Sequence, residues 1–139
     1  MSTRTRMDAK SVTPNFFTTK IEETKAFYEA HLGFRSNFHQ PGGYIGLQCG
    51  DNHATMLGFM APPPGAPAGS PEGLMYGLVV EDVDREHERL VEEGVAVVDP
   101  PEDQPWGGRR MTLRDPNGIL VMLFHPIPPD AEHAGYVVD

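Results

Sequence analysis

Between residues 105 and 124 the apolar positions alternate with other residues, which is the pattern of β-strands. The segment Asp115-Pro116-Asn117-Gly118 divides this stretch as a tight turn, because proline presets φ and glycine supplies a positive φ. After the turn both alternating sets are apolar, one starting at Ile119 and the other at Leu120. A strand that is apolar on both faces is central in its sheet. We therefore predict that one face of this strand packs on helices and the other on a cavity or core.

Two segments place apolar residues at the three- and four-residue spacings of an amphipathic helix. The first is predicted to begin after Thr19, because Glu22 lies three residues further on, as in a capping box. It is predicted to end at Gly33, since glycine readily adopts the left-handed conformation that follows a helix. The second is predicted to begin after Asp82, whose carboxylate can accept from free backbone amides, and to end at Gly94.

Short apolar segments around these helices predict the remaining strands. They lie at residues 12–18, 34–39, 44–49, 54–60, 74–80 and 95–98. Together with the two strands that flank the turn, they repeat the order βαβββ, which indicates an internal duplication. We therefore predict an α+β fold in which two βαβββ modules form curved mixed sheets.

The predicted domain consists of module 1 at residues 11–60 and module 2 at residues 74–126. The linker 61–73 is rich in proline and can form neither a helix nor a strand ladder. Residues 1–10 are expected to be disordered, and the tail 127–139 is either loose or adds a strand to a neighbour. Because open sheets have edges to pair, the modules are expected to complete each other within one chain or across a homodimer.

The charge balance limits the partners of the chain. It carries 20 acidic and 11 basic residues, a formal net charge of −9, which argues against nucleic acids and anionic membranes. The single cysteine, Cys49, excludes an internal disulfide and fits a reducing compartment. Residues 1–10 contain no apolar core of a signal peptide. The expected location is therefore cytoplasmic, with no membrane partner.

Five local motifs occur in a familiar order along the chain. They are Ala-Phe-Tyr-Glu-Ala-His-Leu-Gly-Phe at 26–34, Val-Glu-Asp-Val-Asp at 80–84, Glu-Glu-Gly-Val at 92–95, Pro-Glu-Asp-Gln-Pro-Trp-Gly at 101–107 and Asp-Pro-Asn-Gly at 115–118. Together with the repeated βαβββ pattern, they resemble the vicinal oxygen chelate superfamily of glyoxalases, bleomycin-resistance proteins and dioxygenases. The resemblance covers about residues 12–126 and implies a homodimer whose sheets form cups. This scaffold hosts enzymes and binding proteins alike, so the resemblance leaves the reaction open.

In the metal-using members of that superfamily, inward-facing histidine, glutamate or glutamine side chains hold a cation at four matched points. Here these points fall near Thr13 or Asn15, around residues 56–58, at Leu78 and at Met122. Threonine, leucine and methionine do not suit a divalent cation that needs imidazole or carboxylate. The expected protein therefore has no metal and no other cofactor.

The sequence gives few signs of a histidine metal site or of a catalytic nucleophile. The chain has six histidines, and no two of them have a typical metal-ligand spacing. His39, His53 and His125 remain candidates for a metal site with displaced ligands, against the alternative of scattered surface groups. Cys49 is predicted to be a small buried hydrophobic residue rather than a nucleophile. No nucleophile elbow, phosphate loop or dinucleotide fingerprint occurs, so no catalytic residue is predicted.

Aromatic side chains and one arginine complete the candidate site. Trp106 is expected at the mouth of the second cup, where it either stacks on a ligand or plugs the core. Arg109 either pairs with a carboxylate or phosphate of a ligand or forms a salt bridge to Glu81, Asp82 or Asp115. The predicted ligand-binding residues are Phe17, Phe38, Tyr44, Leu78, Trp106, Arg109 and Met122.

Three functions remain. The favoured one is metal-free capture of a small aromatic or cationic molecule in a cleft between the modules, as in drug sequestration. The second is a divalent-metal-dependent lyase, isomerase or dioxygenase of the same superfamily, and the third is a catalytically silent dimeric scaffold. We favour the binding protein over the enzyme because the matched positions Leu78 and Met122 are apolar.

Overall fold

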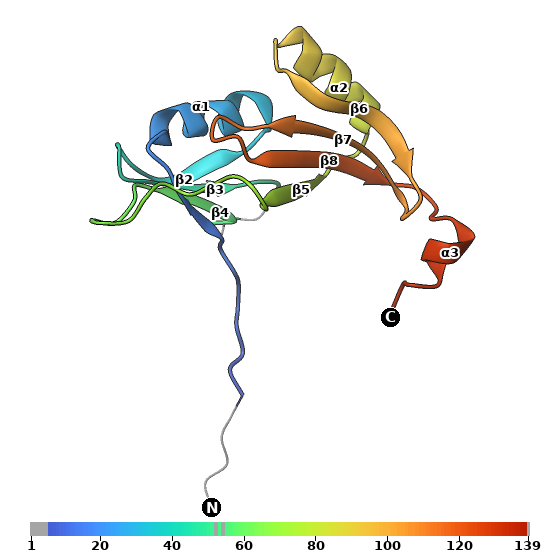
Figure 1. Ribbon diagram of the computed structural model, residues 1–139, viewed down its shortest axis with the longest axis horizontal. Helices are drawn as coiled ribbons and strands as arrows, with labels where there is room; N and C mark the ends of the chain where they lie inside the picture. Colours follow the sequence, from blue (N-terminus) through green and yellow to red (C-terminus); the bar gives the residue numbers. More distant parts are fainter. Residues whose placement is uncertain (1–5, 52, 54, 139) are drawn as a thin grey trace, which may run out of the picture.

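The computed structural model of the protein describes residues 6–51, 53 and 55–138, and it contains two β-sheets with helices on one side (Figure 1). The first sheet and its helix comprise β1 Asn15–Phe17, α1 Ile21–His31, β2 Arg35–Gln40, β3 Tyr44–Gln48 and β4 Leu57–Met60. The second comprise β5 Met75–Val79, α2 Val83–Glu92, β6 Val97–Gln104, β7 Gly108–Arg114 and β8 Leu120–Pro126. A short helix, α3 Ala131–Ala134, follows.

Both sheets have the same topology. The strand order is β1-β4-β3-β2 in the first sheet and β5-β8-β7-β6 in the second. In each sheet the first strand pairs in parallel with the last, and the remaining neighbours are antiparallel. The predicted α+β fold with a duplicated βαβββ pattern is therefore confirmed, and β8 is a central strand as expected.

The helix ends follow the sequence signals in three of four places. Gly33 and Gly94 have φ of 72° and 83°, the left-handed conformation expected after a helix. The Asp82 side chain caps α2 by accepting from the backbone amides of Asp84 and Arg85. These three predictions are confirmed.

The predicted capping box at the start of α1 is wrong. The N-cap residue is Lys20, and no side chain accepts a capping hydrogen bond there. The Lys20 amide donates instead to the Thr18 hydroxyl at 2.9 Å. Glu22, which the capping box would have turned back toward Thr19, accepts from His39 at 2.9 Å. The contact of Glu22 with His39 on β2 therefore takes the place of the predicted capping box.

One other prediction needs correction. Strand β6 runs to Gln104 through Pro100 and Pro101, although the sequence predicted a strand only at 95–98. Proline is tolerated there because β6 is an edge strand with register shifts along its pairing. In the tail, α3 is a one-turn helix capped by Asp130, and the addition of a strand to a neighbour stays a prediction. The part of the predicted disorder that falls on residues 1–5 lies outside the described residues.

A buried polar contact joins helix α1 of module 1 to the turn at 115–118 of module 2. Tyr28 of α1 is fully buried, and its hydroxyl donates to Asp115 Oδ2 at 2.9 Å. The other carboxylate oxygen accepts from the backbone amides of Asn117 and Ile119 at 2.8 and 3.0 Å. Burial, with the nearby Asp115 carboxylate, raises the pKa of Tyr28 far above its ordinary value. The hydroxyl therefore remains a donor at all ordinary pH values.

The two helices are joined directly as well. Arg89 of α2 donates to the His31 carbonyl oxygen at 2.8 Å, and the His31 ring contacts Glu93 at 2.8 Å. Hydrogen bonds from His31 and Arg89 lower the pKa of Glu93. These contacts fix the two helices relative to each other. Among the described residues, no helix combines the length and the apolar character needed to cross a bilayer.

Candidate functional site

Each sheet has one face that packs on a helix and one that does not. In β3 the helix-facing residues Ile45 and Leu47 are fully buried, and in β8 Val121 and Leu123 are buried in the same way. Side chains alternate along a strand, so the intervening residues project to the other side. We call this other side the open face of each sheet.

The open face of the second sheet is apolar on two strands and polar on a third. Its residues form three rows across β5, β8 and β7, as the strand register defines them. The rows are Met75–Leu120–Arg114, Gly77–Met122–Thr112 and Val79–Phe124–Arg110. Met75 and Val79 are exposed by 50% and 69%. The open face of the second sheet therefore presents an uncovered apolar strip bordered by hydrogen-bond donors.

The open face of the first sheet carries more polar groups. Tyr44 donates its hydroxyl to Asn15 Oδ1 at 3.2 Å, and Thr55 donates to Asn37 Oδ1 at 2.9 Å. A Cβ atom at Gly58 would lie 1.9 Å from Asn15 Oδ1. Glycine at this position therefore lets the polar side chains lie flat on the sheet.

The predicted aromatic residues Phe17, Phe38 and Tyr44 lie on the open face of the first sheet. Phe17 and Tyr44 both align with Met60 in the strand register, and Phe38 aligns with Gly46. The Phe38 and Tyr44 rings meet edge to face with centroids 5.7 Å apart, and Phe38 is 57% exposed. These rings provide an uncovered surface for contact with an aromatic group.

Trp106 lies at the rim of the open face of the second sheet. It follows β6 in a turn, and its ring packs edge to face on Phe124 with centroids 5.6 Å apart. A Cβ atom at Gly108 would lie 2.3 Å from the indole, so the ring covers this glycine. Trp106 is still 42% exposed. The indole thus packs on the protein and also presents part of its surface outward.

Leu78 and Arg109 do not lie on the open face, in contrast to Met122. Leu78 aligns with buried Leu123 and contacts the core, so the open-face residue of β5 next to Met122 is Gly77. The prediction that Leu78 lies beside Met122 on the ligand-binding surface is therefore wrong. In β7 the open-face residue is Arg110, one position after Arg109.

Arg109 forms salt bridges instead of facing a ligand cavity. Its guanidinium donates to Asp84 at 2.9 Å and to Asp103 at 3.0 Å. These hydrogen bonds raise the pKa of Arg109, and the same contact lowers the pKa of Asp84. The salt-bridge interpretation is thus correct, but the partners predicted from the sequence, Glu81, Asp82 and Asp115, are not.

The histidines proposed as displaced metal ligands lie apart and have other contacts. His39 of β2 contacts Glu22, and His125 Nδ1 of β8 accepts from the Val83 amide at 2.9 Å. His53 lies in the segment between β3 and β4. Within the described part of the chain, no group of three histidine, cysteine, aspartate or glutamate side chains could hold a metal ion. The metal-free state stays a prediction.

Replacing Gly108 by alanine is expected to displace the indole of Trp106, because the added Cβ atom would overlap the ring. Trp106 is the only tryptophan, so its fluorescence reports this change directly. We expect a red-shifted emission as the ring loses its contact with Phe124. Gly77→Ala is the matched control, because its Cβ atom would make only ordinary contacts and the emission should stay unchanged. An unshifted emission of Gly108→Ala would contradict the placement of Trp106.

The duplicated fold and its two open faces define a protein of the glyoxalase type. Residues 11–123 match the Glyoxalase/Bleomycin resistance protein/Dioxygenase superfamily, and the chain belongs to this family. It is 34% identical over 119 residues to the bleomycin resistance protein of Klebsiella pneumoniae, covering 81% of this chain and 89% of that protein.

Other relatives agree with the family assignment. The chain is 31% identical over 124 residues to CFP32 of Mycobacterium tuberculosis, covering 86% of this chain, but it spans only about half (48%) of the length of CFP32. Among solved structures it resembles TnmS3, an antibiotic binding protein from Streptomyces sp. CB03234. The TM-score is 0.71 at 31% identity, and the match covers 87% of this chain and 99% of TnmS3.

Proposed function

We propose that this protein captures small aromatic molecules, without a metal ion, on the open faces of its sheets. The observation that carries the proposal is the uncovered apolar strip of Met75, Leu120, Met122 and Phe124, with Trp106 at its rim. Apolar surface with a few placed polar groups is typical of small-molecule sites. The similarity to an antibiotic binding protein and to a bleomycin resistance protein supports binding as the function.

We further propose that the protein acts as a cytoplasmic homodimer. Each open face exposes large apolar side chains, including Phe38 at 57% and Val79 at 69%. A second copy that faces these surfaces would close them into clefts and remove apolar area from water. The dimer would therefore enclose the open faces, which a single chain leaves exposed to solvent.

The net charge influences which ligands approach. A formal charge of −9 attracts cations over long range, so planar aromatic cations should associate faster than anions at low salt. This attraction weakens as salt shortens the screening distance to about 8 Å at physiological ionic strength. The apolar strip therefore supplies the contact energy, and the net charge acts mainly on the rate of encounter.

Fluorescence titration of Trp106 tests this proposal, because no other tryptophan contributes to the signal. Bleomycin and the planar cation proflavine should each be added to the purified protein. We expect saturable quenching by at least one of them at micromolar concentrations. The absence of a response to a wide panel of aromatic compounds, in a protein with normal thermal unfolding, would reject the proposal.

A further inference from the structure

The three arginines of β7 differ in their partners. Arg109 pairs with Asp84 and Asp103, and Arg110 lies 3.9 Å from Asp99. Arg114 donates to the Gly118 carbonyl oxygen at 2.9 Å and has no carboxylate within salt-bridge distance among the described residues. Arg114 is therefore the one guanidinium of this strand whose charge no described acidic side chain compensates.

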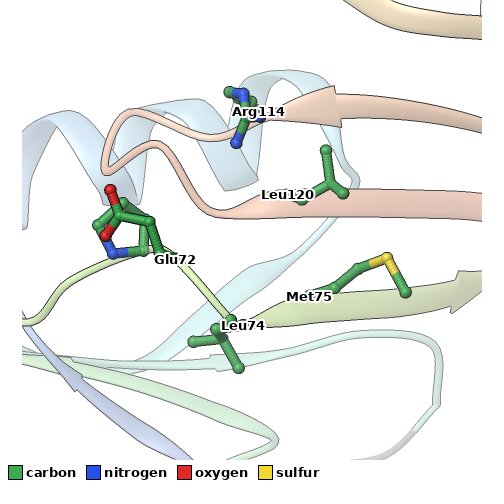
Figure 2. A pocket seen from close by; sticks show the side chains of 7 residues that line it. Glu72, Leu74, Met75, Arg114 and Leu120 are labelled. Atoms are coloured by element: carbon green, nitrogen blue, oxygen red, sulfur yellow. The ribbon is translucent and has the colours of Figure 1, made fainter.

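Arg114 borders a cavity of about 520 Å³ at the end of the apolar strip (Figure 2). In Figure 2, the side chains of Arg114, Leu120 and Met75 come from β7, β8 and β5, which is one row of the strand register. Leu74 and Pro71 extend the apolar lining on the segment that leads into β5. This volume lies in the range of small-molecule sites, which are typically about 300–1,000 Å³.

One acidic side chain also lines this cavity. Glu72 accepts a hydrogen bond from the Ser70 hydroxyl and forms no salt bridge with Arg114. Like charges repel at short range, so the carboxylate of Glu72 disfavours ligands with two negative charges. A ligand with one negative charge could place that charge against Arg114. The cavity therefore fits a ligand with a single negative charge better than a phosphate with two.

We propose that this cavity binds the carboxylate of an aromatic monoacid, with Arg114 as its partner and Met75 and Leu120 against its apolar body. A guanidinium presents two parallel N–H donors that match a carboxylate. The inference rests on the proposed small-molecule binding and adds a ligand class to it. The net negative charge acts over long range and is screened by salt, whereas the contact with Arg114 acts at hydrogen-bond distance.

The test compares 1-naphthylacetate with its neutral analogue 1-naphthylacetamide by isothermal titration calorimetry on the full chain. We expect the acid to bind roughly tenfold more tightly than the amide, because a hydrogen bond to a charged group is about twice as strong as a neutral one. Arg114→Gln should remove this preference, and Arg114→Lys should keep part of it. Leu120→Ala should weaken both compounds by a similar factor.

Arg85→Gln is the matched control, since this exposed arginine lies on α2, away from the cavity and from both open faces, and should leave the preference intact. Thermal unfolding of each variant verifies that the hairpin remains folded. Equal affinity for acid and amide, unaffected by Arg114→Gln, would overturn the inference while leaving small-molecule binding in place. Failure of both naphthyl compounds to bind would also overturn it. The titrations with bleomycin and proflavine then decide the proposed function separately.

Discussion

Replacing Asp115 by alanine is expected to lower the free energy of unfolding by about 3 kcal/mol, the range for breaking a buried charged hydrogen-bond network. Asp115 is only 5% exposed and accepts from the Tyr28 hydroxyl and from the amides of Asn117 and Ile119. The alanine variant leaves these buried donors without a partner. Urea unfolding at neutral pH, followed by circular dichroism, measures the loss.

One further variant measures the contribution of the Tyr28 hydroxyl to stability, and another is a surface control. Tyr28→Phe removes only the hydroxyl and should cost about 1–2 kcal/mol, as for one buried hydrogen bond. Glu132→Ala on the exposed helix α3 should change stability by less than about 0.5 kcal/mol, as surface substitutions usually do. If Asp115→Ala were as stable as the unmodified protein, the turn at 115–118 would not be joined to α1 as described.

Replacing Met122 by lysine is expected to weaken proflavine binding roughly 100-fold, because it places an ammonium group on the apolar strip and repels a cation. Met122 lies in the middle row of the open face, between Gly77 and Thr112. It is only partly buried, so the fold should tolerate the change. Trp106 fluorescence titration gives the affinity, and thermal unfolding verifies the fold.

Val91→Lys is the matched control for this experiment. Val91 lies on α2, 53% exposed, and not on either open face. The same chemical change there should alter proflavine affinity less than about threefold, through the net charge alone. Equal losses in the two variants would mean that the ligand does not contact the open face of the second sheet.

The fold was predictable because its signals are local. The alternation after the turn placed β8 in the centre of a sheet, and Gly33, Asp82 and Gly94 marked helix ends correctly. Where a distant partner competed with the local signal, prediction failed. Glu22 contacts His39 on β2 instead of completing a capping box, and no local pattern indicates that contact.

The site was less predictable because it depends on strand register. Alternation in β5 is ambiguous, since Leu78 and its apolar neighbours fit either face, and only pairing with β8 assigns Gly77 to the open face. For β7 the sequence did contain a signal for the face of Arg109. Side chains alternate along a strand, so Arg109, two residues before the apolar Met111, lies on the same helix-facing side. The polar pair of Asn37 and Thr55 was missed because Asn37 lies at a register shift in β2.

The metal content of the active protein tests the central claim most directly. The protein should be purified without chelators and analysed by inductively coupled plasma mass spectrometry, and the same sample titrated with proflavine. We expect much less than one divalent metal ion per chain, with saturable quenching of Trp106 that is unchanged by added EDTA. A near-stoichiometric content of zinc, nickel, iron or manganese, with binding lost in EDTA, would contradict it.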